Sequence, residues 1–237
     1  MDRPFVMASP LIAVIPARGG SKRIPRKNVR PFEGKPIIAH TIASALESGL
    51  FEQVVVSTDD AEIAEVARQN GAKVPFLRDK QLADDFTPVS EVTTDVIRRI
   101  DPDGDKFAIV AQLMPNCPLR TSRDVIDSHK QFEETASESQ ISVVRYGWQN
   151  PWWAMQQNER YELQPLFQEQ MSQRSQDLPE LFCPTGAIWW ARTNVLRRTK
   201  TFHIDGRTGW EIPWQRGIDI DSLDDWKLAE ALFRLQQ

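Results

Sequence analysis

The stretch Leu11-Ile12-Ala13-Val14-Ile15-Pro16-Ala17-Arg18-Gly19-Gly20 decides how this chain can fold. It begins with an apolar run, and a short apolar run bounded by turn residues is typical of a strand buried on both faces. Pro16 and the Gly19–Gly20 pair end the strand and begin a loop. The run is far too short to span a membrane. No cleavage pattern of small residues follows it, so neither a membrane segment nor a signal peptide is expected.

Beyond this stretch, helical and strand-like patterns alternate as far as residue 135. Strands are expected at residues 54–56, 73–77 and 107–113, and helices at residues 37–46, at 90–100, after an N-cap at Asp59, and from about Ser122. The alternation indicates an α/β fold with a mixed, mostly parallel sheet and helices on both faces. Ligands bind such sheets at the carboxyl ends of the strands, so the Gly19–Gly20 loop, the Ser57–Asp59 corner and the loop after Leu113 are predicted to line one site.

The pattern changes after residue 140. Short strands are expected at residues 141–146, 152–156 and 161–163, and a Gln-rich stretch follows at 164–176. We interpret residues 141–182 as an excursion from a core formed by residues 1–140 and 183–237. Five of the eight tryptophans lie between Trp148 and Trp190, and either a partner subunit or the monomer core could bury them. The chain is expected to rejoin the sheet at 187–191, to add a last strand at 218–220, and to end in a helix capped by Ser222.

Charge is distributed unevenly along the chain. The net charge is −4, whereas a general nucleic-acid binder would normally be basic. Residues 18–35 nevertheless carry a local charge of +6, from seven basic side chains and one acidic side chain: Arg18, Lys22, Arg23, Arg26, Lys27, Arg30, Lys35 and Glu33. A basic loop on an acidic protein indicates a small polyanionic ligand and no nucleic acid.

The Gly19–Gly20 loop carries the clearest chemical signal. Paired glycines after a buried strand let backbone N–H groups approach phosphates without obstruction. Lys22 and Lys27 supply point charges, and Arg18 supplies a planar fork suited to phosphate oxygens. The glycine spacing matches neither a Walker P-loop nor the dinucleotide-binding fingerprint. An ordinary solvated basic turn is the alternative.

Asp219 and Asp221 form a second chemical feature. Residues i and i+2 on a strand point to the same face, so both carboxylates could reach one ligand. Two carboxylates close together suit Mg²⁺, which completes its coordination with phosphates and waters. Helix capping is the alternative, because Asp221 immediately precedes Ser222 and the last helix.

Cysteine and histidine contribute little to the prediction. The two cysteines, Cys117 and Cys183, imply no disulfide framework and fit a reducing cytoplasm. The three histidines, His40, His129 and His203, stand singly without the spacing of zinc ligands.

The sequences of several motifs resemble those of the acylneuraminate cytidylyltransferase family. The motifs occur in the expected order as Pro16-Ala17-Arg18-Gly19-Gly20-Ser21-Lys22-Arg23-Ile24-Pro25-Arg26-Lys27-Asn28, Val56-Ser57-Thr58-Asp59, Leu82-Ala83-Asp84-Asp85, Pro115-Asn116-Cys117-Pro118-Leu119-Arg120, Gly186-Ala187-Ile188 and Ile218-Asp219-Ile220-Asp221. The first and last are quite specific, and together they span residues 11 to about 230. Kdo cytidylyltransferases look similar in fold, but their first loop usually has the sequence Thr-Arg-Leu-Pro-Gly-Lys-Pro. This chain has Lys22-Arg23-Ile24-Pro25-Arg26-Lys27-Asn28 there, which favours the sialic-type branch.

The resemblance implies a Rossmann-like nucleotidyltransferase fold, a homodimer and dependence on Mg²⁺. It assigns the CTP phosphates to Arg18, Gly19, Gly20, Ser21, Lys22, Lys27 and Asn28, the cytosine and ribose to the position of Arg78, the metal to Asp219 and Asp221, and the sugar carboxylate to Arg174. The implied reaction joins CTP to an acidic nine-carbon sugar by attack of the anomeric hydroxyl on the α-phosphorus, with release of pyrophosphate. Lys22 and Arg18 would offset the developing charge, and either Asp221 or a metal-activated hydroxyl would remove the proton.

Two departures from the family leave the acceptor sugar open. Met114 stands where the family commonly has a glutamine that can contact the sugar, and Thr185 where it commonly has an asparagine. The acceptor could therefore be an N-acylneuraminate or a pseudaminic, legionaminic or Kdo-type acid. A catalytically silent nucleotide-binding protein is the alternative from another class, although Asp219, Asp221 and Lys22 are all present.

Overall fold

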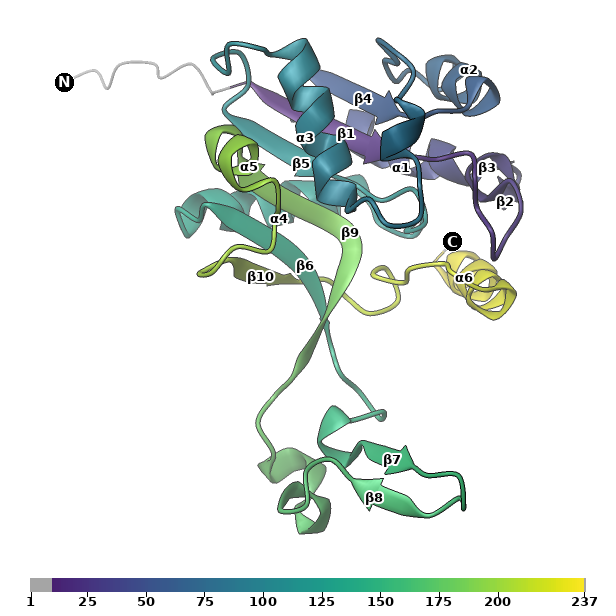
Figure 1. Ribbon diagram of the computed structural model, residues 1–237, viewed down its shortest axis with the longest axis vertical. Helices are drawn as coiled ribbons and strands as arrows, with labels where there is room; N and C mark the ends of the chain where they lie inside the picture. Colours follow the sequence, from purple (N-terminus) through teal and green to yellow (C-terminus); the bar gives the residue numbers. More distant parts are fainter. Residues whose placement is uncertain (1–9, 237) are drawn as a thin grey trace, which may run out of the picture.

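The computed structural model describes residues 10–236. Its centre is a six-stranded sheet in the order β10-β6-β9-β5-β1-β4 (Figure 1). The strands are β1 Leu11–Pro16, β4 Gln53–Ser57, β5 Ile109–Gln112, β6 Ser139–Arg145, β9 Phe182–Arg192 and β10 Thr208–Glu211. β1 pairs in parallel with β4 and β5, and β10 with β6, whereas β9 runs antiparallel to β5 and β6. The predicted mixed, mostly parallel sheet is confirmed.

Helices cover both faces of the sheet, as predicted. They are α1 Ile37–Glu47, α2 Ala61–Gln69, α3 Val89–Ile100, α4 Ser122–Glu134, α5 Thr193–Thr199 and α6 Leu223–Leu235. Alternate residues of β1 serve the two faces: Ala13 and Ile15 pack in one core with α1, α2 and α4, and Ile12 and Val14 in another with α3 and α5. Figure 1 shows α3 in front of β1 and β5. None of the helices within residues 10–236 is long and apolar enough to cross a membrane.

Some predicted elements are wrong in detail. Residues 73–77 contribute only an isolated bridge between Val55 and Lys73, because Pro75 has no backbone N–H to extend a ladder. Residues 218–220 form no strand either, and the sixth strand is β10, which was not predicted. The N-cap of α2 is Asp60 rather than Asp59: its carboxylate accepts the N–H groups of Glu62 and Ile63 at 2.9 and 3.0 Å.

A third core joins the two ends of the chain. After the glycine loop come a short 3₁₀ helix, η1 Lys27–Val29, and a small hairpin of β2 Pro31–Phe32 and β3 Lys35–Pro36. The turn of this hairpin places Glu33 and Gly34 at φ of 45° and 83°. The core also includes residues of α6: its buried members are Ile24, Phe32, Ile37, Leu119, Ile220, Trp226 and Ala229. The last helix therefore packs beside the first loop.

Residues between β6 and β9 form a small lobe that stands away from the sheet (Figure 1). It contains a two-stranded sheet, β7 Met155–Gln157 with β8 Leu163–Pro165, and three short 3₁₀ helices at Pro151–Trp153, Gln170–Ser172 and Ser175–Asp177. The predicted strands at 152–156 and 161–163 both lie further along the chain. Pro151 begins a 3₁₀ turn in place of the first, and Tyr161 occupies a left-handed turn at φ 63° before the second.

The tryptophans between residues 148 and 190 differ widely in burial within one chain. Trp190 is completely buried in the sheet core, stacked against Phe51 and Phe132. Trp148, in the lobe, is 87% exposed. The monomer core therefore accounts for some of these residues and leaves others on the surface of the lobe.

Candidate active site

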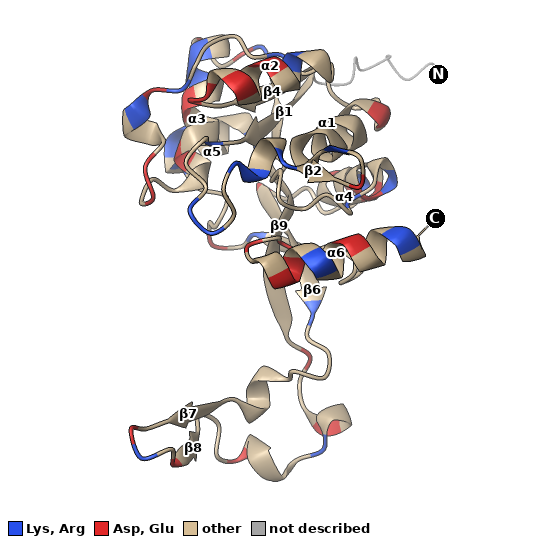
Figure 2. Ribbon diagram, turned by 90° about the vertical axis from the view of Figure 1, so that its right-hand side faces the viewer, with Lys and Arg blue, Asp and Glu red and all other residues tan. Residues whose placement is uncertain are grey.

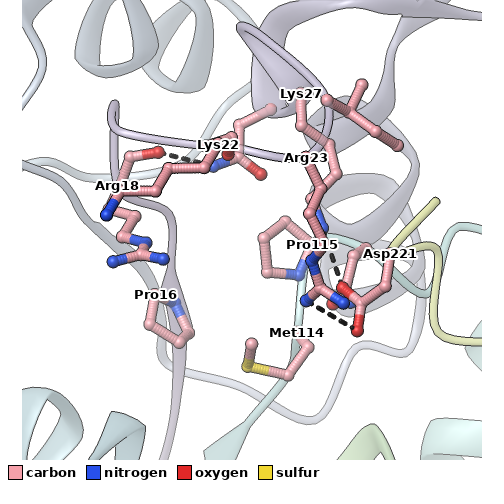
Figure 3. Close-up of a pocket in the computed structure, with 12 residues that line it drawn as sticks. Pro16, Arg18, Lys22, Arg23, Lys27, Met114, Pro115 and Asp221 are labelled. Carbon is pink, nitrogen blue, oxygen red and sulfur yellow. Dashed lines mark hydrogen bonds and ion pairs between the residues drawn. The ribbon is translucent and has the colours of Figure 1, made fainter. Parts of the chain in front are cut away.

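The glycine loop leaves β1 at the edge of the sheet where the parallel strands end. The Ala17 N–H donates to the Ser57 carbonyl at the end of β4, at 2.9 Å, and residues 114–116 follow β5 at the same edge. These segments enclose a cavity of about 200 Å³ (Figure 3). It is lined by Pro16, Arg18, Ser21, Lys22, Arg23, Ile24, Lys27, Asn28, Met114, Pro115, Asn116 and Asp221.

Two neighbouring aspartates at the start of α2 hold the shape of the loop. The Gly19 N–H donates to the Asp59 carboxylate at 3.0 Å. Arg26 lies in the left-handed region at φ 55°, a conformation that is uncommon for a residue with a Cβ. Its guanidinium contacts the carboxylates of Asp60, at 2.5 Å, and of Glu62. The loop is therefore tied to α2 at both of its ends.

Acidic side chains already pair with the cations of the loop. Arg18 and Lys22 both contact the Asp85 carboxylate, Arg18 at 2.8 Å. Lys27 and Arg23 contact Asp221 at 3.2 and 3.1 Å, as the dashed lines in Figure 3 show. A bound phosphate would have to compete with these carboxylates for the same N–H donors.

Asp219 is the more buried of the two predicted metal ligands. Its carboxylate accepts the Gly186 N–H at 3.1 Å and the Cys117 thiol. Burial raises the pKa of Asp219, and the nearby charge of Asp221 acts in the same direction. A cation bound between Asp219 and Asp221 would stabilise the charged form of the Asp219 carboxylate.

Asp219 and Asp221 also line a second cavity, of about 400 Å³. The remaining side chains around it are Val89, Met114, Asn116, Pro184, Thr185, Gly186, Trp189 and His203. Met114, Asn116 and Asp221 belong to both cavities, so the two adjoin along these residues.

The helix-capping alternative for Asp221 does not hold. Ser222 caps α6, with its side chain accepting the Asp225 N–H at 3.2 Å while the Asp225 carboxylate accepts the Ser222 N–H. The Asp221 carboxylate instead faces Lys27 and Arg23. It can therefore be changed without removing the helix cap.

The two carboxylates fit a magnesium ion, which uses one or two protein carboxylates and takes its other ligands from phosphates and waters. No group of three or more His, Cys, Asp or Glu side chains able to hold a metal occurs in the part of the chain that the structure describes. With two protein carboxylates, a cation bound here would take its other ligands from phosphates and waters.

Most of the site residues predicted from sequence lie at one of the two cavities, and a few do not. Gly19 and Gly20 shape the loop without lining either cavity. Arg78 is buried and donates to the Ser57 hydroxyl and carbonyl, and burial lowers its pKa to about 10. Arg174 lies in the lobe, where it pairs with Asp177 at 2.8 Å. Within one chain, the structure does not bring Arg174 to either cavity.

Several residues at the cavities were not predicted as site residues. In the first cavity they are Pro16, Arg23, Ile24, Pro115 and Asn116. In the second they are Asn116 again and Val89, Pro184, Gly186, Trp189 and His203. All five residues of the first group lie within the two motifs at residues 16–28 and 115–120, so their place in these motifs was the available signal. His203 and Trp189 come from separate segments that only the fold brings together, where their rings meet at 4.8 Å.

The fold and the site together define a nucleotidyltransferase. The structure is similar to that of a CMP:2-keto-3-deoxy-manno-octonic acid synthetase complexed with CTP, with a TM-score of 0.72, 97% of this chain and 100% of that chain covered, and 19% identity. At that identity the likeness is one of fold.

The chain belongs to the cytidylyltransferase family, whose family model matches residues 12–150. It is 35% identical to the CMP-N,N'-diacetyllegionaminic acid synthase of Legionella pneumophila, over 96% of this chain and 97% of that protein. It is 32% identical to the pseudaminic acid cytidylyltransferase of Campylobacter jejuni, over 94% and 96%. It is 30% identical to the N-acylneuraminate cytidylyltransferase of Escherichia coli, over 94% of this chain and 52% of that protein. The predicted family and enzyme class are confirmed.

Proposed function

We propose that this cytidylyltransferase joins CTP to a nonulosonic acid, giving the CMP-sugar and pyrophosphate. The observation that carries the proposal is the pair of adjoining cavities. One is lined by the cations of the glycine loop, and the other opens beyond Asp219 and Asp221. A triphosphate in the first and a sugar in the second would meet at the shared residues Met114, Asn116 and Asp221.

The reaction consists of attack by the anomeric hydroxyl of the sugar on the α-phosphorus, with departure of pyrophosphate. Such a transfer depends mainly on positioning and on neutralising charge. Arg18 and Lys22 would exchange the Asp85 carboxylate for phosphate oxygens. Lys27 would hold the segment of residues 219–221 close to the reacting phosphate through its contacts with the Ile220 carbonyl, at 2.7 Å, and with Asp221.

Asp219 and Asp221 would hold Mg²⁺ in this proposal. Bound there, the ion would offset charge on the phosphates and lower the pKa of a coordinated hydroxyl. The Gly186 N–H and the Cys117 thiol keep the Asp219 carboxylate oriented toward the cavity. The proton of the attacking hydroxyl would pass either to Asp221 or directly to solvent.

The identity of the acceptor is tested by measuring pyrophosphate release from CTP with a panel of acids: N-acetylneuraminic, legionaminic, pseudaminic and Kdo. Turnover with at least one nine-carbon acid, and far less with UTP in place of CTP, is the expected result. A pocket built for one base leaves polar groups unpaired with another. Binding of CTP without turnover of any acid would instead support the silent nucleotide-binding protein.

We also propose that the protein is a homodimer in which the lobe packs on a second copy. Large apolar side chains of the lobe are exposed, including Trp148 at 87% and Tyr161 at 80%, and most of the lobe's ribbon is free of charged residues (Figure 2). Exposed aromatic surface of this kind is typical of an interface. The lobe would then carry Arg174 toward the sugar site of the partner. Both cysteines are free, which supports the cytoplasm as the compartment.

A further inference from the structure

The loop of residues 81–87, here called the acidic loop, contacts the cations of the glycine loop. It contains the motif Leu82-Ala83-Asp84-Asp85. Its turn is closed by Asp84, whose carboxylate accepts the N–H groups of Phe86 and Thr87 at 2.9 and 2.6 Å. A carboxylate that accepts backbone N–H groups two and three residues later forms a tight local turn. This turn gives the acidic loop a defined shape at the point where it meets the glycine loop.

Asp85 is an internal counterion for two cations at once. Arg18 donates to the Asp84 carbonyl at 2.7 Å and pairs with one oxygen of the Asp85 carboxylate at 2.8 Å. Lys22 pairs with the other oxygen of the same carboxylate. The hydrogen bond from Lys22 and then that from Arg18 are the main reasons that the pKa of Asp85 lies below its ordinary value of 3.8. The carboxylate is therefore charged at neutral pH.

The cations of the first cavity form two sets on opposite sides of it. Figure 3 shows the side chains of Arg18 and Lys22 on one side. On the other side, Arg23 and Lys27 both contact Asp221. Asp221 also lines the second cavity, so its side is where the sugar would meet the α-phosphate. The side of Arg18 and Lys22 would then receive the phosphates that leave as pyrophosphate.

We infer that Asp85 competes with the pyrophosphate group for Arg18 and Lys22, and so limits how tightly the enzyme holds CTP and the pyrophosphate product. The inference deepens the proposed function and rests on it only in taking the first cavity as the CTP site. A phosphate oxygen gains the donors of Arg18 and Lys22 only after the carboxylate has left them. Every ligand that reaches these two cations therefore binds more weakly than it would without Asp85. Weaker ground-state binding does not slow the chemical step, and it favours departure of the product.

The test is Asp85→Asn, which removes the charge and keeps the size of the side chain. By titration calorimetry at one fixed Mg²⁺ concentration, the Kd of pyrophosphate is expected to fall roughly three- to tenfold, the range for the loss of two exposed ion pairs. The Kd of CTP should fall by a similar factor. The Kd of CMP should not change, because its one phosphate belongs on the Asp221 side. A merely structural role, in which Asp85 positions Arg18 and Lys22 for phosphate, would instead raise the Kd of pyrophosphate.

Asp79→Asn is the matched control, because Asp79 is an exposed acid just before the acidic loop and pairs with Arg99. It should leave all three Kd values unchanged. The inference would be overturned by an unchanged or higher Kd of pyrophosphate in Asp85→Asn, by an equal gain for CMP, or by an equal effect of Asp79→Asn. These measurements need no acceptor sugar. A wild-type protein that bound neither CTP nor pyrophosphate would refute the proposed function, whereas the other outcomes would overturn the inference alone.

Discussion

The carboxylate of Asp60 fills the space beside Gly19: a Cβ built on Gly19 would lie 2.8 Å from Asp60 Oδ2. Asp60 cannot easily move aside, because it caps α2 and contacts Arg26. Gly19 is therefore required by close packing, and its backbone torsions would tolerate another residue.

Gly19→Ala should displace the glycine loop and weaken the use of CTP. Overpacking of this kind costs about 1–3 kcal/mol, so we expect the KM for CTP to rise roughly tenfold or more. Gly147→Ala, outside the loop, is the matched control, because nothing lies within 4 Å of a Cβ at that position. Similar KM values in the two variants would contradict the proposed packing.

Lys22→Ala should reduce kcat/KM for CTP without unfolding the protein. A charge-assisted hydrogen bond is worth about 1.5–3 kcal/mol, or roughly ten- to hundredfold. The Lys22 side chain is 77% exposed, so its loss should leave Tm nearly unchanged. Lys130→Ala, which removes an equally exposed lysine from α4, controls for the general loss of positive charge. An unchanged kcat/KM in Lys22→Ala would exclude this lysine from the site.

Asp221→Asn should lower turnover by orders of magnitude at a near-normal Tm, because Ser222 and Asp225 cap α6 without it. Partial recovery at raised Mg²⁺ or Mn²⁺ is expected, since the amide supplies a single, weaker oxygen to a cation. Asp224→Asn, which changes an exposed aspartate in the first turn of α6, should remain fully active. Full activity of Asp221→Asn at ordinary Mg²⁺ would refute the metal role.

Asp60→Asn should change how stability depends on pH. The hydrogen bond from Arg26 is the main reason that the pKa of Asp60 lies below its ordinary value of 3.8. A carboxyl with a lowered folded-state pKa contributes stability above its unfolded-state pKa and loses it as the pH falls through the folded value.

Asn still caps the helix but carries no charge to lose. The difference in Tm between the wild type and Asp60→Asn should therefore be largest near neutral pH and shrink below about pH 4. Thermal melts across this range measure it, and the other titrating groups are common to both proteins. If the difference in Tm between the two proteins did not change with pH, the contact between Arg26 and Asp60 would add no stability.

A mixture of Lys22→Ala and Arg174→Ala should regain activity that each variant lacks alone. Arg174 lies in the lobe and Lys22 in the core, so a lobe that acts on its partner would give each mixed dimer one intact site. The variants should be mixed under conditions that let subunits exchange, and the formation of mixed dimers should be verified by mass. Mixed dimers without regained activity would contradict a role for Arg174 in the partner's site.

The spacing of apolar residues along the sequence predicted most of the strands and helices, because the residues buried in the structure follow the same spacing. The apolar run of β1 and the helical spacing of α1 and α3 are both strong local signals. β10 was missed because its sequence, Thr-Gly-Trp-Glu, is too short to show alternation, and it joins the sheet only through its pairing with β6. The segment at 218–220 has the composition of a strand but uses a single backbone bond, from the Ile220 N–H to the Asn116 carbonyl.

The site was predictable where its residues are contiguous. The loop from Arg18 to Asn28 carries its chemistry in one stretch. Asp59 lies 40 residues from Gly19 along the chain, and it was expected near the loop because it follows a parallel strand. The carboxylates of Asp60 and Asp85 lie 34 and 63 residues from the cations that they contact, and no spacing rule connects them to the loop. How far the lobe lies from the cavities within one chain could not be predicted either, because three-dimensional packing sets that distance.

The third core has a consequence for how the enzyme is made. Lys27 and the Ile220 carbonyl that it contacts are separated by 193 positions, and the apolar residues beneath the loop come partly from α6. Chains fold from the amino end as they leave the ribosome. The glycine loop therefore emerges early, but it lacks part of its apolar floor and the carboxylates of Asp219 and Asp221 until residues 219–235 have been synthesised. The candidate site is therefore among the last parts of the fold to be completed.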